Sequence, residues 1–122
     1  MELFDVTERA LEVALHGNEL RQQVISNNLA NVNTPGFKRS DVEFGHQLAE
    51  ALQFSPDSPS AVGGVTPVVQ QDNVSTMRVD GNNVDVDREA TYLAETQLHF
   101  QTLMAVVTKN MQTMSSIITG AR

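Results

Sequence analysis

The most regular stretch of this chain is residues 86–118, which read VDREATYLAETQLHFQTLMAVVTKNMQTMSSII. Apolar residues recur there at alternating spacings of four and three, the period at which one face of a helix meets a partner helix. Nine of the ten positions are apolar, and together they form the predicted C-terminal seam: Val86, Ala90, Leu93, Gln97, Phe100, Met104, Val107, Met111, Met114 and Ile118. The stretch predicts a helix over residues 85–119 that packs against other helices.

The ends of this helix carry matching signals. Asp85 is a favourable N-cap, and Asp87 and Glu89 place negative charge in the first turn, where the helix dipole favours it. Gly120 is a suitable terminator. Four further apolar residues widen the stripe beyond one seam, namely Leu98, Leu103, Val106 and Ile117. A stripe of this width predicts more than one packing neighbour.

A second, less regular helix is predicted over residues 5–32. Asp5 and Glu8 have the spacing of a capping box at its start. The apolar residues that follow form an N-terminal seam, interrupted by Gly17 and Asn18, which contains Leu11, Leu15, Ile25, Leu29 and Val32. Glycine weakens a helix interior by up to about 1 kcal/mol. Gly17 therefore predicts either a bend or a close approach of another backbone.

The middle of the chain is harder to interpret. Residues 33–52 predict a tight turn, a short extended segment at 41–44 and a brief helix at 46–52. Residues 53–82 hold three of the four prolines and three of the seven glycines, which predicts a flexible loop or a segment that orders against a partner. A weak hairpin between Val65–Val69 and Met77–Val79 is the alternative.

Together these segments predict a mainly α fold in one domain over residues 1–122. Its two long terminal helices pair as an antiparallel coiled coil around an irregular, partly disordered or weakly β middle segment. Such a hairpin leaves much of the wide C-terminal stripe uncovered, and an exposed apolar surface of that extent indicates association with other helices.

Composition excludes several classes of function. The net charge is −7, which argues against nucleic acid and anionic membranes as partners, because both are bound through clustered Lys and Arg. The chain has no cysteine, so disulfides and thiol chemistry are excluded. Four acidic residues in the first fifteen do not fit a secretory signal. No apolar run approaches the length of a membrane span.

No pattern in the chain predicts catalysis, a metal site, a cofactor or a small-molecule substrate. The histidines His16, His46 and His99 do not have the spacing of metal ligands on one helix. Residues 80–91 are rich in oxygen ligands, but the glycine and the final residue do not fit a calcium loop. Nucleophile elbows, phosphate loops and dinucleotide fingerprints are also missing from the sequence.

The most distinctive stretch is residues 26–39, SNNLANVNTPGFKR. Asparagine is costly inside a helix and favours caps and turns, so one interpretation is a frayed helix end. However, Asn27, Asn28 and Asn31 are interleaved with apolar residues. The alternative is therefore a packed junction in which side-chain amides satisfy backbone groups.

This stretch resembles the N-terminal signature of the flagellar rod and hook family, which runs approximately S-N-N-x-A-N-x-x-T-x-G-[FY]-K. The matching signature residues, with the proline of the turn, are Ser26, Asn27, Asn28, Ala30, Asn31, Thr34, Pro35, Gly36, Phe37 and Lys38. Residues 41–44 and 81–89 resemble segments of one short rod-protein type. The compact turn at 34–36 lacks the insertion usual in the other short type, FlgC.

The resemblance implies a structural, non-enzymatic subunit of the proximal rod in the flagellar basal body. It implies assembly with copies of itself, with FliE, FlgC and other rod proteins, and next to the MS ring. It also implies export through the flagellar type III apparatus into the periplasmic rod without a cleaved signal peptide. The alternative that the residues leave open is a cytoplasmic helical adaptor or export chaperone that binds partner helices.

Overall fold

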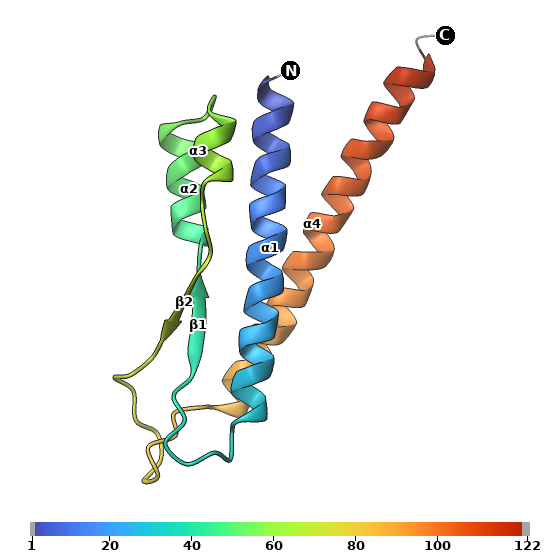
Figure 1. The fold of residues 1–122 in the computed structure, drawn as a ribbon. Helices are drawn as coiled ribbons and strands as arrows, with labels where there is room; N and C mark the ends of the chain where they lie inside the picture. Colours follow the sequence, from blue (N-terminus) through green and yellow to red (C-terminus); the bar gives the residue numbers. More distant parts are fainter. Residues whose placement is uncertain (1, 121–122) are drawn as a thin grey trace.

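The computed structural model describes residues 2–120 as two long helices joined by a small middle region (Figure 1). The predicted fold class is confirmed. In chain order the elements are α1 (Glu2–Ala30), β1 (Ser40–Glu43), α2 (Gly45–Phe54), α3 (Pro59–Gly63), β2 (Val68–Gln71) and α4 (Val86–Gly120). Within this described part, no helix combines the length and apolarity that crossing a lipid bilayer requires.

The two terminal helices run antiparallel and are closest where α1 ends and α4 begins (Figure 1). From there α4 diverges from α1, so that its C-terminal half projects away from the rest of the molecule. The middle region packs on another side of α1. The long N-terminal helix therefore lies between the middle region and the first half of α4.

The apolar core lies mainly between α1 and the middle region. Its buried apolar residues are Val6, Val13, Ile25, Val42, Phe44, Val62 and Val84. Within the described part of α4, only the polar residues Glu89 and Thr96 are buried. The face of α4 toward α1 otherwise consists of half-buried residues such as Leu93, Leu103 and Val107. Thus the fully buried side chains of the described part of α4 are polar and lie near its start.

The sequence predicts the start of α4 correctly but not the start of α1. Asp85 Oδ1 accepts hydrogen bonds from the backbone N–H of Asp87 and Arg88 at 3.0 and 3.3 Å, so the predicted N-cap is confirmed. The capping box predicted at Asp5 is wrong, because α1 already begins at Glu2. Asp5 therefore lies inside the helix.

The middle region contains more regular structure than a loop. Residues 53–82, predicted to be a flexible loop, hold α3 and β2. The alternative hairpin is also wrong, because β2 does not pair with Met77–Val79. It pairs antiparallel with β1, with Val42 opposite Val69. Val42 is buried against the core, and this long-range pairing cannot be read from the local alternation of the sequence.

Gly17 lies at a close approach, as one of the two interpretations of the sequence predicts. The approaching group is a side chain, however, and not a backbone. A Cβ at this position would lie 2.7 Å from three atoms of the Phe44 ring. Phe44 is buried, and the Arg21 guanidinium covers its ring at 5.1 Å from the centroid. The ring therefore has little room to move away.

We expect Gly17→Ala to lower the free energy of unfolding by about 1–3 kcal/mol, the usual cost of overpacking. This net loss would occur although alanine is the better helix former by about 1 kcal/mol. A double-mutant cycle with Phe44→Leu, measured by urea denaturation, checks the cause. The two substitutions should be strongly non-additive, and simple additivity would refute the steric explanation.

Candidate functional site

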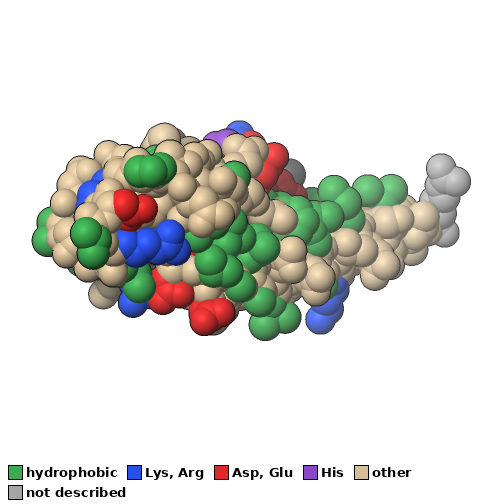
Figure 2. All heavy atoms as spheres, turned by 90° about the horizontal axis from the view of Figure 1, so that it is seen from below, with side chains coloured by type: hydrophobic (Ala, Val, Ile, Leu, Met, Phe, Trp, Pro, Cys, Tyr) green, Lys and Arg blue, Asp and Glu red, His purple; other side chains and the backbone are tan. Residues whose placement is uncertain are grey.

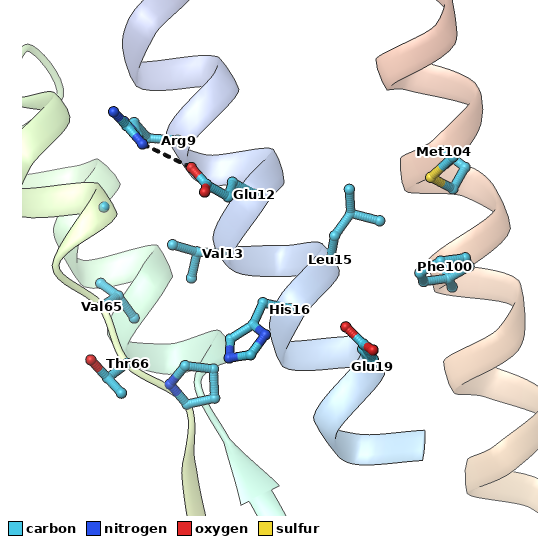
Figure 3. Close-up of a pocket in the computed structure, with 12 residues that line it drawn as sticks. Arg9, Glu12, Val13, Leu15, His16, Glu19, Val65, Thr66, Phe100 and Met104 are labelled. Carbon is cyan, nitrogen blue, oxygen red and sulfur yellow. Dashed lines mark hydrogen bonds and ion pairs between the residues drawn. The ribbon is translucent and has the colours of Figure 1, made fainter. Parts of the chain in front are cut away.

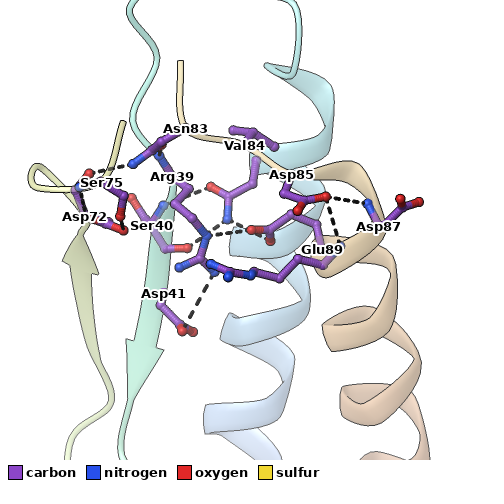
Figure 4. A network of polar contacts seen from close by, with 12 residues as sticks. Arg39, Ser40, Asp41, Asp72, Ser75, Asn83, Val84, Asp85, Asp87 and Glu89 are labelled. Carbon is purple, nitrogen blue, oxygen red and sulfur yellow. Dashed lines mark hydrogen bonds and ion pairs between the residues drawn. The ribbon is translucent and has the colours of Figure 1, made fainter. Parts of the chain in front are cut away.

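The site is built where the end of α1, the chain around Arg39 and the start of α4 meet (Figure 4). Glu89 is fully buried, and its Oε1 accepts a hydrogen bond from Arg39 Nε at 2.6 Å. Its Oε2 accepts one from Asn28 Nδ2 at 3.1 Å. A buried carboxylate is tolerated only when it is paired and hydrogen-bonded in this way. Glu89 therefore ties α4 to both other segments.

The Arg39 guanidinium is held on several sides. It lies 5.7 Å from the centroid of the Tyr92 ring, and its Nη2 lies 3.8 Å from Asp41 Oδ2. Burial alone would lower the pKa of Arg39, but its hydrogen bond to Glu89 and the charges of Glu89 and Asp41 raise that pKa above its ordinary value. Arg39 is therefore charged at neutral pH.

Buried asparagines complete the junction by satisfying backbone groups. Asn28 Oδ1 accepts a hydrogen bond from the Ser40 N–H at 3.0 Å, and its Nδ2 donates to the Ser40 carbonyl at 2.8 Å. Asn83 Oδ1 accepts from the Arg39 N–H at 2.7 Å, while its Nδ2 donates to the Asp72 carbonyl at 2.9 Å. The predicted role of side-chain amides is confirmed for Asn28.

Asn82 holds the turn that follows α1. Its Nδ2 donates to the carbonyls of Asn31, Val32 and Thr34 at 3.0, 3.1 and 2.9 Å. These three carbonyls belong to the turn after α1, which ends at Ala30, and Asn82 supplies them with a donor from a distant part of the chain. Its Oδ1 accepts a hydrogen bond from the Val84 N–H at 2.8 Å.

The two turns of the junction meet at glycines. Gly36 and Gly81 both have positive φ, at 74° and 85°. The Gly36 N–H donates to the Asp80 carbonyl at 2.9 Å, and a Cβ on Gly81 would lie 3.7 Å from the Gly36 Cα. Positive φ is the conformation that glycine adopts without strain. A residue with a side chain at Gly36 would therefore hold this turn only with strain.

We expect Gly36→Val to lower the free energy of unfolding by about 1–3 kcal/mol through backbone strain, and to impair assembly. Open space surrounds the position, so a steric clash would not contribute. Gly45→Val is the matched control, because Gly45 also has open space but lacks a positive φ. Equal losses in the two variants, measured by urea denaturation, would contradict the strain argument.

The signature residues divide between the junction and the surface. Only Asn28 among them is buried, and Asn31, Phe37 and Lys38 are half-buried. The exposed ones are Ser26, Asn27, Ala30, Thr34, Pro35 and Gly36. Arg39, Glu89, Asn82 and Asn83 lie in the junction but were not predicted as site residues. The sequence marks the polar runs in which they stand, but it does not show that these side chains are buried.

The predicted seams also divide. Ile25 is buried, while Leu11, Leu15, Leu29, Val32, Leu93 and Val107 are half-buried. The remaining seam residues of α4 are exposed, namely Val86, Ala90, Gln97, Phe100, Met104, Met111, Met114 and Ile118. Met111 is 66% and Ile118 72% exposed. Figure 2 shows hydrophobic side chains along the arm of α4 that projects from the body of the molecule.

Beyond the junction, a groove opens beside α1. One hollow of about 670 Å³ lies among α1, the 63–67 segment and the Phe100–Met104 side of α4. A second, of about 350 Å³, lies between Glu8–Leu15 of α1 and Val107–Met114 of α4. Both are lined by Glu12 and Leu15. In Figure 3, Leu15 points from α1 toward α4, where Phe100 and Met104 lie.

Comparisons with known proteins agree with this geometry. A family model described as "Flagella basal body rod protein" matches residues 9–38, which cover most of α1 and the junction turn. The flagellar basal body rod protein FlgB of Bacillus subtilis (strain 168) is 32% identical, over 100% of both chains. The chain belongs to the FlgB family of flagellar basal body rod proteins. The short rod-protein type predicted from residues 41–44 and 81–89 is thereby confirmed.

Other FlgB proteins align over most of their length. FlgB of Borreliella burgdorferi is 35% identical over 84% of each chain. FlgB of Escherichia coli (strain K12) is 27% identical over 97% of this chain and 96% of its own. The FlgB family is a family of structural rod proteins and not of enzymes, which agrees with a site made of packing and hydrogen bonds.

Proposed function

We propose that this chain is a structural subunit of the proximal rod of the bacterial flagellar basal body. In this proposal it polymerises through α1 and α4 and helps to form a hollow rod that transmits torque. The observation that carries the proposal is the exposed apolar surface of α4. Phe100, Met104 and Met111 repeat at helical spacing on a described helix that buries no apolar side chain of its own. Such a surface requires neighbours.

The proposed neighbours are copies of the same chain together with FliE, FlgC and other rod proteins, adjoining the MS ring. Membership of the FlgB family supports association with other flagellar components in general. The width of the apolar stripe supports several neighbours, because residues such as Leu98 and Ile117 lie outside the seam and are also exposed. Each helix face can then be covered by a different subunit.

The family places the chain in the flagellar basal body. We propose that it reaches the periplasmic rod through the flagellar type III export apparatus, unfolded and without cleavage of a signal peptide. The described core is small, with seven buried apolar residues, which is compatible with unfolding for export. Detection of the full-length chain in purified basal bodies tests the proposal. Its recovery only from the cytosol would instead identify a helical adaptor or chaperone.

We expect Met104→Asp to block rod assembly while the subunit itself still folds. Met104 is 42% exposed, so the charge costs little in the free subunit but several kcal/mol once the side chain is packed in a seam. The equivalent change Phe100→Asp should act in the same way. The measurements are swimming motility and the yield of hook-basal bodies.

Gln101→Asp is the matched control, since Gln101 is exposed outside the apolar stripe. It introduces the same charge at a position three residues earlier and should leave assembly intact. Normal motility and normal hook-basal bodies in both Met104→Asp and Phe100→Asp would reject the seam as the assembly surface.

A further inference from the structure

The groove beside α1 has the form of a site for one more helix. Its two hollows, of about 670 and about 350 Å³, adjoin at Glu12 and Leu15. Its apolar side is formed by residues that repeat along α4, among them Met104, Val107 and Met111. A groove lined by apolar residues at this spacing fits an amphipathic helix with apolar residues at i, i+3 or i+4, and i+7.

The two walls of the groove differ in charge. The α1 wall carries Glu8, Glu12 and Glu19. Arg9, the one arginine or lysine that lines the described groove, is paired with Glu12 at 2.9 Å. The α4 wall offers no charged residue at the hollows, and residues 100–120 contain a single charged side chain, Lys109. The groove is therefore apolar on one side and acidic on the other.

We infer that the groove receives a helix from a different chain, with an apolar stripe bordered on one side by lysine or arginine. A second copy of α1 would bring the same glutamates and meet like charge. A second copy of the α4 arm would bring only Lys109 opposite three carboxylates. The net charge of −7 adds to the preference for a basic partner. This inference rests on the proposed function, and it specifies one heterotypic contact of the subunit.

The test is a titration of the full-length chain with three labelled peptides, followed by fluorescence anisotropy. Two are synthetic helices with an identical leucine stripe, one bordered by lysine and one by glutamate, and the third is residues 86–120 of this chain. The lysine-bordered peptide should bind about tenfold more tightly than the glutamate-bordered one at low salt. The difference should shrink as salt screens the exposed charges.

Two double variants locate the effect. Glu8→Gln with Glu12→Gln should reduce the preference for the lysine-bordered peptide to about threefold or less. Glu50→Gln with Asp57→Asn removes two acidic residues that do not line the groove, and should leave the preference unchanged. An equal reduction in both double variants would mean that only net charge matters, and it would overturn the site.

Equal binding of the two synthetic helices, or tighter binding of the 86–120 peptide, would also overturn the inference. The second result would identify a copy of this chain as the occupant. These outcomes are separate from the fate of the proposed function. If the chain is present in basal bodies but does not prefer the basic peptide, the proposed function stands and the basic partner is rejected. If the chain is absent from basal bodies, the proposed function itself is rejected.

Discussion

Replacing Glu89 by alanine is expected to lower the free energy of unfolding by about 3–5 kcal/mol, the usual cost of removing one partner of a buried ion pair. Glu89 is fully buried and receives hydrogen bonds from Arg39 and Asn28. Its removal leaves the guanidinium buried with the half-exposed Asp41, at 3.8 Å, as its remaining ion-pair partner. Because Glu89 joins α4 to α1, this loss would loosen the pairing of the terminal helices.

Urea denaturation followed by far-UV circular dichroism measures this effect. Asp87→Ala is the matched control, because Asp87 is an exposed acid in the same first turn, and it should cost less than about 1 kcal/mol. A joint change of Arg39→Met and Glu89→Leu should recover much of the loss, since apolar residues of similar volume can replace a buried pair. A loss below about 1 kcal/mol in Glu89→Ala would show that the pair does not hold the junction.

The terminal helices could be predicted from sequence because their signals are local. The four-and-three alternation over residues 86–118 and the Asp85 cap depend only on neighbours along one helix. The same holds for the turn at Gly36, where a proline before a glycine fixes the backbone. These features need no knowledge of what lies across the fold.

The junction could not be predicted in the same way. In the sequence, Glu89 stands in the first turn of α4, where the helix dipole favours a negative charge. Only its contact with Arg39 across the fold makes it a buried ion-pair partner. Asn82 appears in a turn, and its three acceptors lie about fifty residues earlier. The pairing of β2 with β1 has the same origin. Each of these contacts is long-range, and a local pattern carries no information about it.

The seams show a further difference between pattern and packing. The alternation of α4 correctly indicates a surface made for helix packing, but it does not say whether the partner is in the same chain. In the described structure, Met111 and Ile118 remain exposed, and α1 covers only the first part of α4. The pattern therefore describes the assembled state more fully than the free subunit, which is expected where stability depends on association.

Asn82→Asp is expected to destabilise the fold by about 3–5 kcal/mol at neutral pH, although the two side chains have the same shape. The amide of Asn82 shares its two N–H donors among three backbone carbonyls. A carboxylate has no donor, so those carbonyls would lose the amide donor and face a negative charge, although each keeps one other donor, from Thr34 N–H, Arg78 Nη1 or Phe37 N–H. An uncompensated buried charge costs about 3–5 kcal/mol, and Asn82 is fully buried.

The pH dependence gives this prediction a specific signature. Burial and the surrounding carbonyls disfavour the charged form, so the pKa of the introduced carboxyl should be raised in the folded state. A raised pKa means that the folded state takes up the proton more readily than the unfolded state. The variant should therefore recover part of its stability as the pH falls from about 7 to about 5, because the protonated acid can again donate one hydrogen bond.

Urea denaturation at both pH values measures this recovery. The control Asn73→Asp, in an exposed loop position, should show neither the loss nor the recovery. A pH-independent loss in Asn82→Asp would mean that packing, and not donation to the turn after α1, is what Asn82 contributes.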